Sequence, residues 1–177
     1  AGRLEDMGTE AVEPLIDALQ DPNENVRALA VQVLGDICDD RAVPAIVVAL
    51  KDPIANVRSD AAKALGKLRD RRATAGLCAA LTDSDPDVAV AAAEALAVTG
   101  DPAAEGPLIQ ALAAGKAGGG DVPEACARAL SAFSSPQAIA ALGSALSGGA
   151  RGVRSACADG LMLVHCPAAT KLLIGAR

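Results

Sequence analysis

Apolar residues recur along this chain at the spacing of amphipathic helices, and the whole pattern returns every 31 residues. In the first copy, Val12, Leu15, Ile16 and Leu19 stand at i, i+3, i+4 and i+7, which places them on one side of a helix. A second apolar run follows a short polar segment and contains Val26, Ala30, Val33, Leu34 and Ile37. Each copy is therefore predicted to hold two helices, called helix A and helix B below.

The repeat keeps its register over most of the chain. Similar segments start at Ala11, Ala42 and Ala73, and two more start near Ala104 and Ala138. One anchor position of helix A is occupied in turn by Leu15, Ile46, Leu77, Leu108, Leu142 and Leu173, with steps of 31 residues except for one step of 34. A single hairpin cannot bury its own apolar face, so neighbouring copies must stack.

The segments between helix A and helix B contain residues that end one helix and start the next. Asp85 and Pro86 are the clearest case, with Asp as the N-cap and Pro at the first helical position. The sequence therefore predicts an all-α fold. Its architecture is expected to be an α-α superhelix, or solenoid, of about five stacked helical hairpins with a 31-residue repeat.

Composition and charge narrow the class of partner. Hydrophobic residues make up 51% of the chain, yet it has one Phe and no Trp or Tyr, which suits closely packed helices with small side chains. The net charge of −6 and the lack of aromatic faces argue against nucleic acid as a partner. There is no apolar run of membrane-spanning length, so no membrane partner is expected. Five cysteines without framework spacing, and no signal-peptide pattern, favour a reduced, cytoplasmic setting.

The repeat also carries a family resemblance. The pattern A-V-x-P-L-I-x-A-L-x-D…V-R-x-x-A-x-x-x-L-G closely resembles HEAT repeats of the short bacterial type, called PBS-lyase HEAT-like repeats, over nearly the whole chain. The resemblance implies one HEAT-like array over residues 1–177, with partial repeats at both ends. The copies are expected near residues 9–40, 41–71, 72–101, 102–135 and 136–166.

In this family, an Asp in the turn and an Arg that opens helix B form a ladder along the stack. The matching residues are Asp21, Asp52, Asp83, Arg27, Arg58 and Arg154. Ala89 and Pro123 replace the Arg in the third and fourth copies. We therefore expect the ladder to be interrupted there.

The resemblance further implies that helix B lines a concave binding face. Its non-core positions differ between copies, as a recognition surface requires, although drift at solvated positions would look the same. The expected partner-binding residues are Ser59, Lys63, Lys67, Glu94, Val98, Arg128, Ala132, Asp159 and Leu163. Among these, the apolar Val98, Ala132 and Leu163 are the expected contact patch.

Catalytic, metal and cofactor sites are not expected. A single His and no serine motif leave no nucleophile and base to pair. Asp83, Asp85, Asp87 and Glu94 match four positions of a calcium loop, but Val88 stands where the loop needs Gly. The Gly-rich segment 115–120 lacks the phosphate-loop pattern.

The cysteines are read as structural residues. Cys126 and Cys157 occupy a small core position of helix B, and His165-Cys166 is the only place where His and Cys adjoin. A zinc site would need about four ligands, which these residues do not supply.

The main functional hypothesis is a scaffold that binds a protein partner through helix B. One alternative is a non-catalytic repeat domain of a larger enzyme, such as a bilin lyase-like protein. Another is a structural spacer whose ends stack on copies of itself, giving end-to-end self-association. The sequence does not identify the partner.

Overall fold

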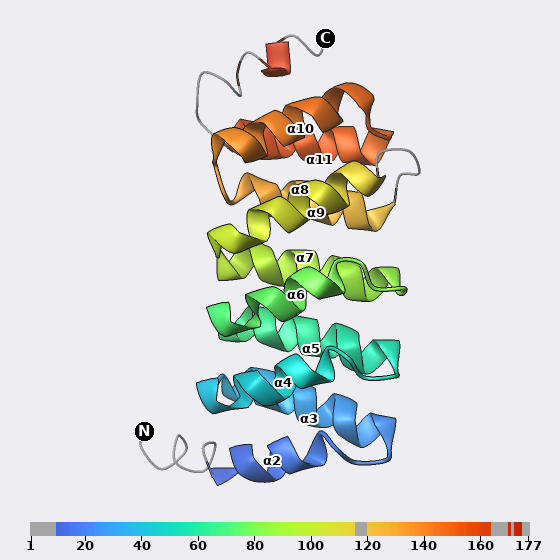
Figure 1. The fold of residues 1–177 in the computed structure, drawn as a ribbon, viewed down its shortest axis with the longest axis vertical. Helices are drawn as coiled ribbons and strands as arrows, with labels where there is room; N and C mark the ends of the chain where they lie inside the picture. Colours follow the sequence, from blue (N-terminus) through green and yellow to red (C-terminus); the bar gives the residue numbers. More distant parts are fainter. Residues whose placement is uncertain (1–9, 116–119, 164–169, 171, 175–177) are drawn as a thin grey trace.

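Pairs of antiparallel helices stack in single file along the molecule (Figure 1). The computed structural model describes residues 10–115, 120–163, 170 and 172–174, and within these it contains helices, turns and no strand. The A helices are α2 (Val12–Ala18), α4 (Val43–Ala49), α6 (Thr74–Ala80), α8 (Glu105–Ala114) and α10 (Pro136–Gly148). The B helices are α3 (Glu24–Ile37), α5 (Ala55–Leu68), α7 (Pro86–Thr99), α9 (Asp121–Ser131) and α11 (Arg151–Leu163). The all-α solenoid expected from the 31-residue repeat is confirmed.

The helices form two layers with the core between them. Each B helix packs against the B helices before and after it and against the A helix of its own pair. One leucine column of the B layer is almost completely buried: Leu34, Leu65, Leu96, Leu130 and Leu161. Burial of one such side chain stabilises the fold by roughly 1.5–3 kcal/mol.

The connection from each B helix to the next A helix has a recurring design in the first three pairs. The B helix ends on a residue in the left-handed conformation: Cys38, Arg69 and Gly100, with φ of 57°, 52° and 63°. An Asp follows, whose carboxylate accepts the backbone N–H two residues ahead: Asp39, Asp70 and Asp101. This bond starts a short 3₁₀ turn: η1 (Asp40–Ala42), η2 (Arg71–Ala73) and η3 (Pro102–Ala104).

The turn from each A helix to its B helix is also held by carboxylates. Asp85 is the N-cap of α7, accepts the N–H of Asp87 at 2.9 Å and precedes Pro86 at the first helical position, as the sequence predicts. In the second pair, Asp52 accepts the N–H of Ile54 at 2.9 Å, whereas Ile54 itself is the N-cap and supplies no capping side chain. The turn Asp therefore stabilises the loop from two positions before the N-cap.

Glycine allows close approach of neighbouring B helices at the first two joints. A methyl group built on Gly35 of α3 would lie 2.8 Å from Cβ of Ala64 in α5. A methyl group built on Gly66 would lie 3.2 Å from Cβ of Ala95 in α7. The third pair has Ala97 at this position. The glycine that follows the buried leucine in these two copies therefore allows close helix packing and does not form a turn.

The first B helix departs from the expected burial pattern. Val26 belongs to a recurring core column and is nevertheless 37% exposed, and Leu29 is 61% exposed. No described helix packs on that side of α3, whereas the equivalent Val57 and Val88 are covered by the preceding pair.

Some sequence-based expectations lie outside the described residues: the N-terminal segment 1–9, most of the Gly-rich segment 115–120 and the pair His165-Cys166. Among the described helices, none combines the length and apolar character needed to cross a bilayer.

Candidate protein-binding face

The outward-facing side of the B helices, called the B face below, carries shallow hollows between consecutive helices. The first hollow, of about 380 Å³, lies between α5 and α7. Its lining is Ala55, Asn56, Ser59, Lys63, Asp85, Asp87, Val90, Ala91 and Glu94. Three of the nine expected binding residues thus meet in one place: Ser59, Lys63 and Glu94.

A second hollow of about 430 Å³ continues along the same two helices. Its lining is Lys63, Gly66, Lys67, Arg69, Ala91, Glu94, Ala95 and Val98. Lys63 and Glu94 line both hollows, so the two form one groove, which we call the α5–α7 groove. Its α5 side carries the cations Lys63, Lys67 and Arg69.

A third hollow of about 460 Å³ lies between α9 and α11. It brings together Arg128, Asp159 and Leu163, three more of the expected residues. Arg128 approaches Glu124 on its own helix at 4.0 Å, and Leu163 is 70% exposed. Exposed ion pairs of this kind contribute at most about 1 kcal/mol to stability, which leaves the guanidinium available to a partner.

The nine expected residues do not form one continuous patch. Val98 is 45% exposed in the α5–α7 groove, whereas Leu163 lies in the third hollow. Ala132 is exposed at the C-cap of α9 and is not among the residues that line either hollow. Val98, Ala132 and Leu163 therefore lie in separate places and do not form the single apolar patch expected from the sequence.

The exposure expected for Ser59 is wrong. Ser59 is only 5% exposed, since α5 packs against both α3 and α7. The equivalent Ala28 is 8% exposed, whereas Ser155 in the last pair is exposed. Ser59 therefore lies at the bottom of the first hollow and presents little surface.

A buried carboxylate organises the neighbouring polar residues. Asp60 is 8% exposed and stands in a column that holds Leu29, Ala91, Ala125 and Ala156 in the other copies. It accepts a hydrogen bond from Nε2 of Gln32 at 2.8 Å, and Nζ of Lys63 lies 3.7 Å from its other oxygen. Sequence reasoning missed Asp60, although its charge in an otherwise apolar column was the available signal.

Lys67 forms an ion pair between neighbouring repeats. Its Nζ lies 2.6 Å from Oδ1 of Asp36, which stands at the equivalent position of the preceding copy. The hydrogen bond from Lys67 to Asp36 raises the pKa of the ammonium group. Both side chains are more than half exposed, so the pair is accessible to a partner and adds little to stability.

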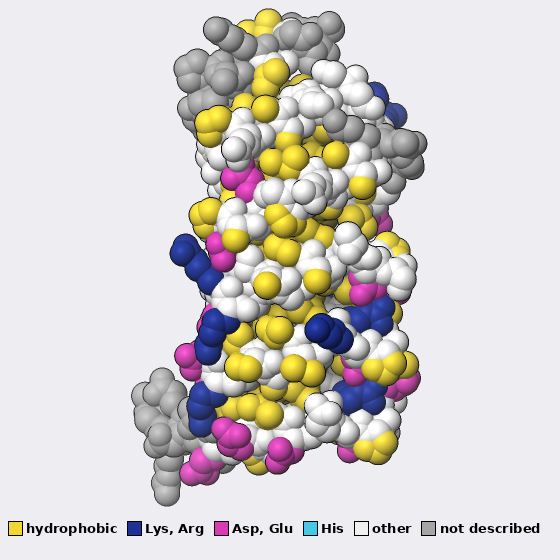
Figure 2. Space-filling view, viewed as in Figure 1, with side chains coloured by type: hydrophobic (Ala, Val, Ile, Leu, Met, Phe, Trp, Pro, Cys, Tyr) yellow, Lys and Arg dark blue, Asp and Glu magenta, His cyan; other side chains and the backbone are white. Residues whose placement is uncertain are grey.

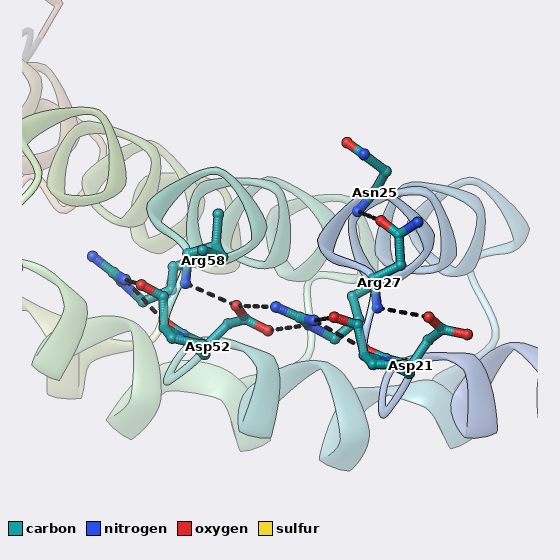
Figure 3. Close-up of polar contacts among 9 residues, drawn as sticks. Asp21, Asn25, Arg27, Asp52 and Arg58 are labelled. Carbon is teal, nitrogen blue, oxygen red and sulfur yellow. Dashed lines mark hydrogen bonds and ion pairs between the residues drawn. The ribbon is translucent and has the colours of Figure 1, made fainter.

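Beneath the B face, arginine and aspartate form the expected ladder (Figure 3). Arg27 donates from Nε and Nη2 to both oxygens of Asp52, at 2.7 and 2.9 Å, and from Nη1 to the carbonyl oxygen of Asp21 at 2.9 Å. Arg58 repeats the arrangement with Asp83, at 2.8 and 2.7 Å, and with the carbonyl of Asp52. Each arginine thus joins its own turn to the next one.

The ladder changes the titration of its carboxylates. The hydrogen bonds from Arg27 and Arg58 lower the pKa of Asp52 and Asp83 respectively, and this outweighs the opposing effect of burial. The side chains involved are only 8–13% exposed. Bidentate charge-assisted pairs are stronger than ordinary hydrogen bonds, so the ladder clamps the first three pairs together.

The ladder ends where both of its partners are lost. Ala89 replaces the arginine of the third copy, and Ala114 stands one repeat after Asp83, where the next aspartate is due. In the last pair, Arg154 donates to the carbonyl of Gly149 at 2.9 Å, without a carboxylate among the described residues. The predicted interruption in the middle copies is confirmed.

Figure 2 shows the face of the stack seen in Figure 1. Hydrophobic side chains run along the middle of this face, and Lys and Arg side chains stand along its edges in the N-terminal half. Charged side chains become sparser towards the C-terminal half. The two halves of the array therefore offer different surfaces.

Two of the four acidic residues that match a calcium loop have other partners. Asp83 pairs with Arg58, and Asp85 caps α7. Within the described ranges, no three His, Cys, Asp or Glu side chains gather in a way that could hold a metal ion. Cys126 and Cys157 are fully buried, as expected, and burial raises the pKa of the Cys126 thiol to about 12.

A family profile described as HEAT repeats matches residues 12–97 and 74–162, which together span most of the chain. The chain belongs to the HEAT repeat family. Its array is a repeat scaffold of a type typically used for protein binding, and such a scaffold is consistent with a non-catalytic role.

Solved structures show the same architecture. The complex of CpcE and CpcF of phycocyanin lyase from Nostoc sp. PCC7120 is similar to this HEAT array over 93% of this chain and 69% of that chain, at 30% identity and a TM-score of 0.76. An engineered protein is similar over 93% of this chain and 84% of its own, at 22% identity and a TM-score of 0.67. A designed armadillo repeat protein covers 92% and 87%, at 17% identity and a TM-score of 0.63. No curated protein sequence matches the chain.

Proposed function

We propose that this HEAT array binds a protein partner through its B face. The observation that carries the proposal is the arrangement of its hollows: six of the nine varied helix-B residues line two separate depressions that the packing of the array leaves open, Ser59, Lys63, Glu94, Arg128, Asp159 and Leu163. Residues beneath the face are engaged in the ladder and the core, so the face can vary without loss of the fold. Repeat proteins use such surfaces for recognition.

The test is capture of partners from a lysate of the source organism with two matched baits. The B-face variant carries Glu94→Lys, Val98→Asp, Arg128→Glu and Leu163→Asp. Lys63 is left unchanged, because its loss would leave the negative charge of buried Asp60 without a nearby cation. The control variant carries substitutions of the same kind on the A helices and their turns: Val48→Asp, Lys51→Glu and Arg72→Glu. Both variants are first checked for native helicity.

A protein that is retained by the native chain and the control, and lost by the B-face variant, would support the proposal. Its purified form should then bind the native chain directly in calorimetry. Proteins lost only with the control variant would assign binding to the A-helix side instead, and the B-face proposal would be abandoned.

A second candidate is a role as the non-catalytic member of a bilin lyase-like assembly. The similarity at 30% identity to the CpcE–CpcF complex of phycocyanin lyase favours it, because that assembly joins two proteins. The discriminating experiment mixes the chain with a bilin and a phycobiliprotein subunit, alone and with a second HEAT protein of the same organism. A change in bilin absorbance only when both HEAT proteins are present would favour this role.

Self-association is tested in the same preparations. Leu29 on α3 and Met162 on α11 are 61% and 64% exposed at opposite ends of the described stack. Light scattering over a range of concentrations separates a monomeric binder from a chain that stacks end to end. A mass that rises with concentration, and falls on Leu29→Lys, would establish the spacer alternative.

A further inference from the structure

The first hollow of the α5–α7 groove is negatively charged, and the one cation in its lining, Lys63, lies beside the carboxylate of Asp60. Asp85, Asp87 and Glu94 contribute three carboxylates from α7 and its cap. Lys63 contributes the one ammonium group, which lies 3.7 Å from buried Asp60. Among the described residues, Asp87 and Glu94 have no ion-pair partner. The uncompensated charge of this hollow is therefore negative.

An unbonded hydroxyl lies at the bottom of the same hollow. Ser59 is 95% buried, yet its hydroxyl makes no hydrogen bond to any described residue. Every fully enclosed side-chain nitrogen or oxygen in the described part of the chain has a partner, so this hydroxyl must open towards the hollow. A hydroxyl that opens into a hollow is hydrogen-bonded by solvent, and a donor that enters the hollow can take the place of that water.

The second hollow of the groove has the opposite character. Lys63, Lys67 and Arg69 stand on its α5 side. The α7 side is apolar at Ala91, Ala95 and Val98 and carries one carboxylate, Glu94, which the two hollows share. Arg69 has no ion-pair partner in the described structure. It also holds φ at 52°, a conformation that favours glycine, and Gly100 takes the equivalent place one repeat later. Arg69 thus holds a left-handed backbone conformation that is strained for a residue with a side chain.

The distance between the two hollows matches the length of a few residues of extended peptide. Their lining residues on α5 are centred about seven residues apart, which corresponds to about 10 Å along a helix. An extended chain covers this distance in about three residues. Side chains of opposite charge, separated by this interval, would each face the complementary hollow.

We propose that the α5–α7 groove binds an extended protein segment that places a Lys or Arg side chain in the first hollow and an acidic side chain about three residues away in the second. The cation would contact Glu94 and Asp87 and donate to Ser59, while its aliphatic stem would lie against Val90. The carboxylate would contact Arg69 and Lys67. This proposal rests on the B-face function and specifies the partner's chemistry at one part of it.

The experiment selects peptides from a random twelve-residue library displayed on phage, with the full chain immobilised. Enriched peptides are synthesised with a fluorescent label, and their dissociation constants are measured by anisotropy. The expected peptides carry Lys or Arg about three residues from Asp or Glu. Glu94→Lys should weaken their binding at least tenfold. Ser59→Ala should weaken it about fivefold, the effect of one hydrogen bond.

Matched variants separate loss of the site from damage to the fold. Asp159→Lys makes the same charge reversal at the equivalent column of the third hollow, and it should leave binding unchanged. Arg69→Gly should weaken binding several-fold while the melting temperature stays the same or rises, because glycine relieves the left-handed strain. Loss of binding together with stability in Arg69→Gly would assign the residue a structural role and overturn its part in the proposal.

The remaining outcomes distinguish this proposal from the general one. Peptides that lose binding with Arg128→Glu or Leu163→Asp, but not with Glu94→Lys, would overturn the groove proposal and still support the B face. Enriched peptides without the paired charges, or no enrichment at all, would also overturn the groove proposal. The capture experiment would then decide the B-face function independently.

Discussion

At the scale of single residues, Arg27 and Arg58 each join two consecutive turns by four hydrogen bonds, and Arg58 joins the second turn to the third. It donates to both oxygens of Asp83 and to the carbonyl oxygens of Asp52 and Pro53. Arg58→Met keeps much of the aliphatic stem and removes all of these bonds. We expect a loss of about 1–3 kcal/mol in the free energy of unfolding, measured by urea denaturation. Lys51→Met is the control, since Lys51 is exposed and has no ion pair among the described residues, and it should change stability little.

The ladder also predicts how stability depends on pH. The folded-state pKa values of Asp52 and Asp83 are lowered, so the ionised carboxylates stabilise the fold above the unfolded pKa of about 4. This contribution is lost as the pH falls from about 4 through the folded-state values. The double variant Asp52→Asn and Asp83→Asn should be less stable at pH 6 and should show a shallower decline between pH 5 and 3. The free energy of unfolding is measured by urea denaturation at each pH. If it declines between pH 5 and 3 as steeply in the double variant as in the native chain, the assignment is contradicted.

The residue scale also shows where sequence reasoning stopped. The arginine and aspartate positions followed from the repeat, because each copy carries them in the same register. The burial of Ser59 did not follow, because exposure in a column depends on packing against the neighbouring helices, which a single copy does not encode. Asp60 was missed for a related reason, since its partner Gln32 lies on another repeat.

At the scale of helices, the spacing of α3 and α5 depends on glycine. Gly35→Ala would force a methyl group to within 2.8 Å of Cβ of Ala64, so the two helices would have to separate. We expect a destabilisation of about 1–3 kcal/mol from this overpacking. Gly106→Ala in α8 has open space around the added methyl group, and it should stabilise the protein by about 0.5–1 kcal/mol through helix propensity. Thermal melts of both variants test the contrast, and a stabilising Gly35→Ala would refute the close approach.

The helices themselves were largely predictable, and their connections were not. Apolar spacing placed both helices of each copy, because burial of one side of a helix imposes that spacing on the sequence. The left-handed residues Cys38 and Arg69 gave no sequence signal, since only Gly100 is the residue type expected there. The 3₁₀ turns that follow them were likewise not foreseen.

At the scale of the whole molecule, the joint between the third and fourth pairs differs from the two before it. It lacks the ladder, because Ala89 and Ala114 replace the arginine and the aspartate, and Ala97 replaces the glycine of close approach. The joint between the fourth and fifth pairs also lacks the ladder, because Pro123 replaces the arginine. In a linear array, stability is a sum over repeats and their joints, so these two joints are expected to open before the first two. Hydrogen exchange should show α9 and α11 exchanging as a unit of lower stability than α3, α5 and α7. Exchange of all five helices with one common free energy would contradict the prediction.

The repeating ladder has a consequence for the gene as well as for the fold. Removal of the 31 residues 42–72 would bring Asp83 to the place of Asp52, one repeat after Arg27, with every apolar position still in register. The shortened protein should therefore fold, and circular dichroism should show its helicity undiminished per residue. Recombination between the first three copies can therefore change their number and still give a chain whose apolar positions and ladder residues are in register. The same exchange across the fourth copy would meet the three-residue insertion and an arginine without its acid, so copy number is free to drift at one end of this array and is constrained at the other.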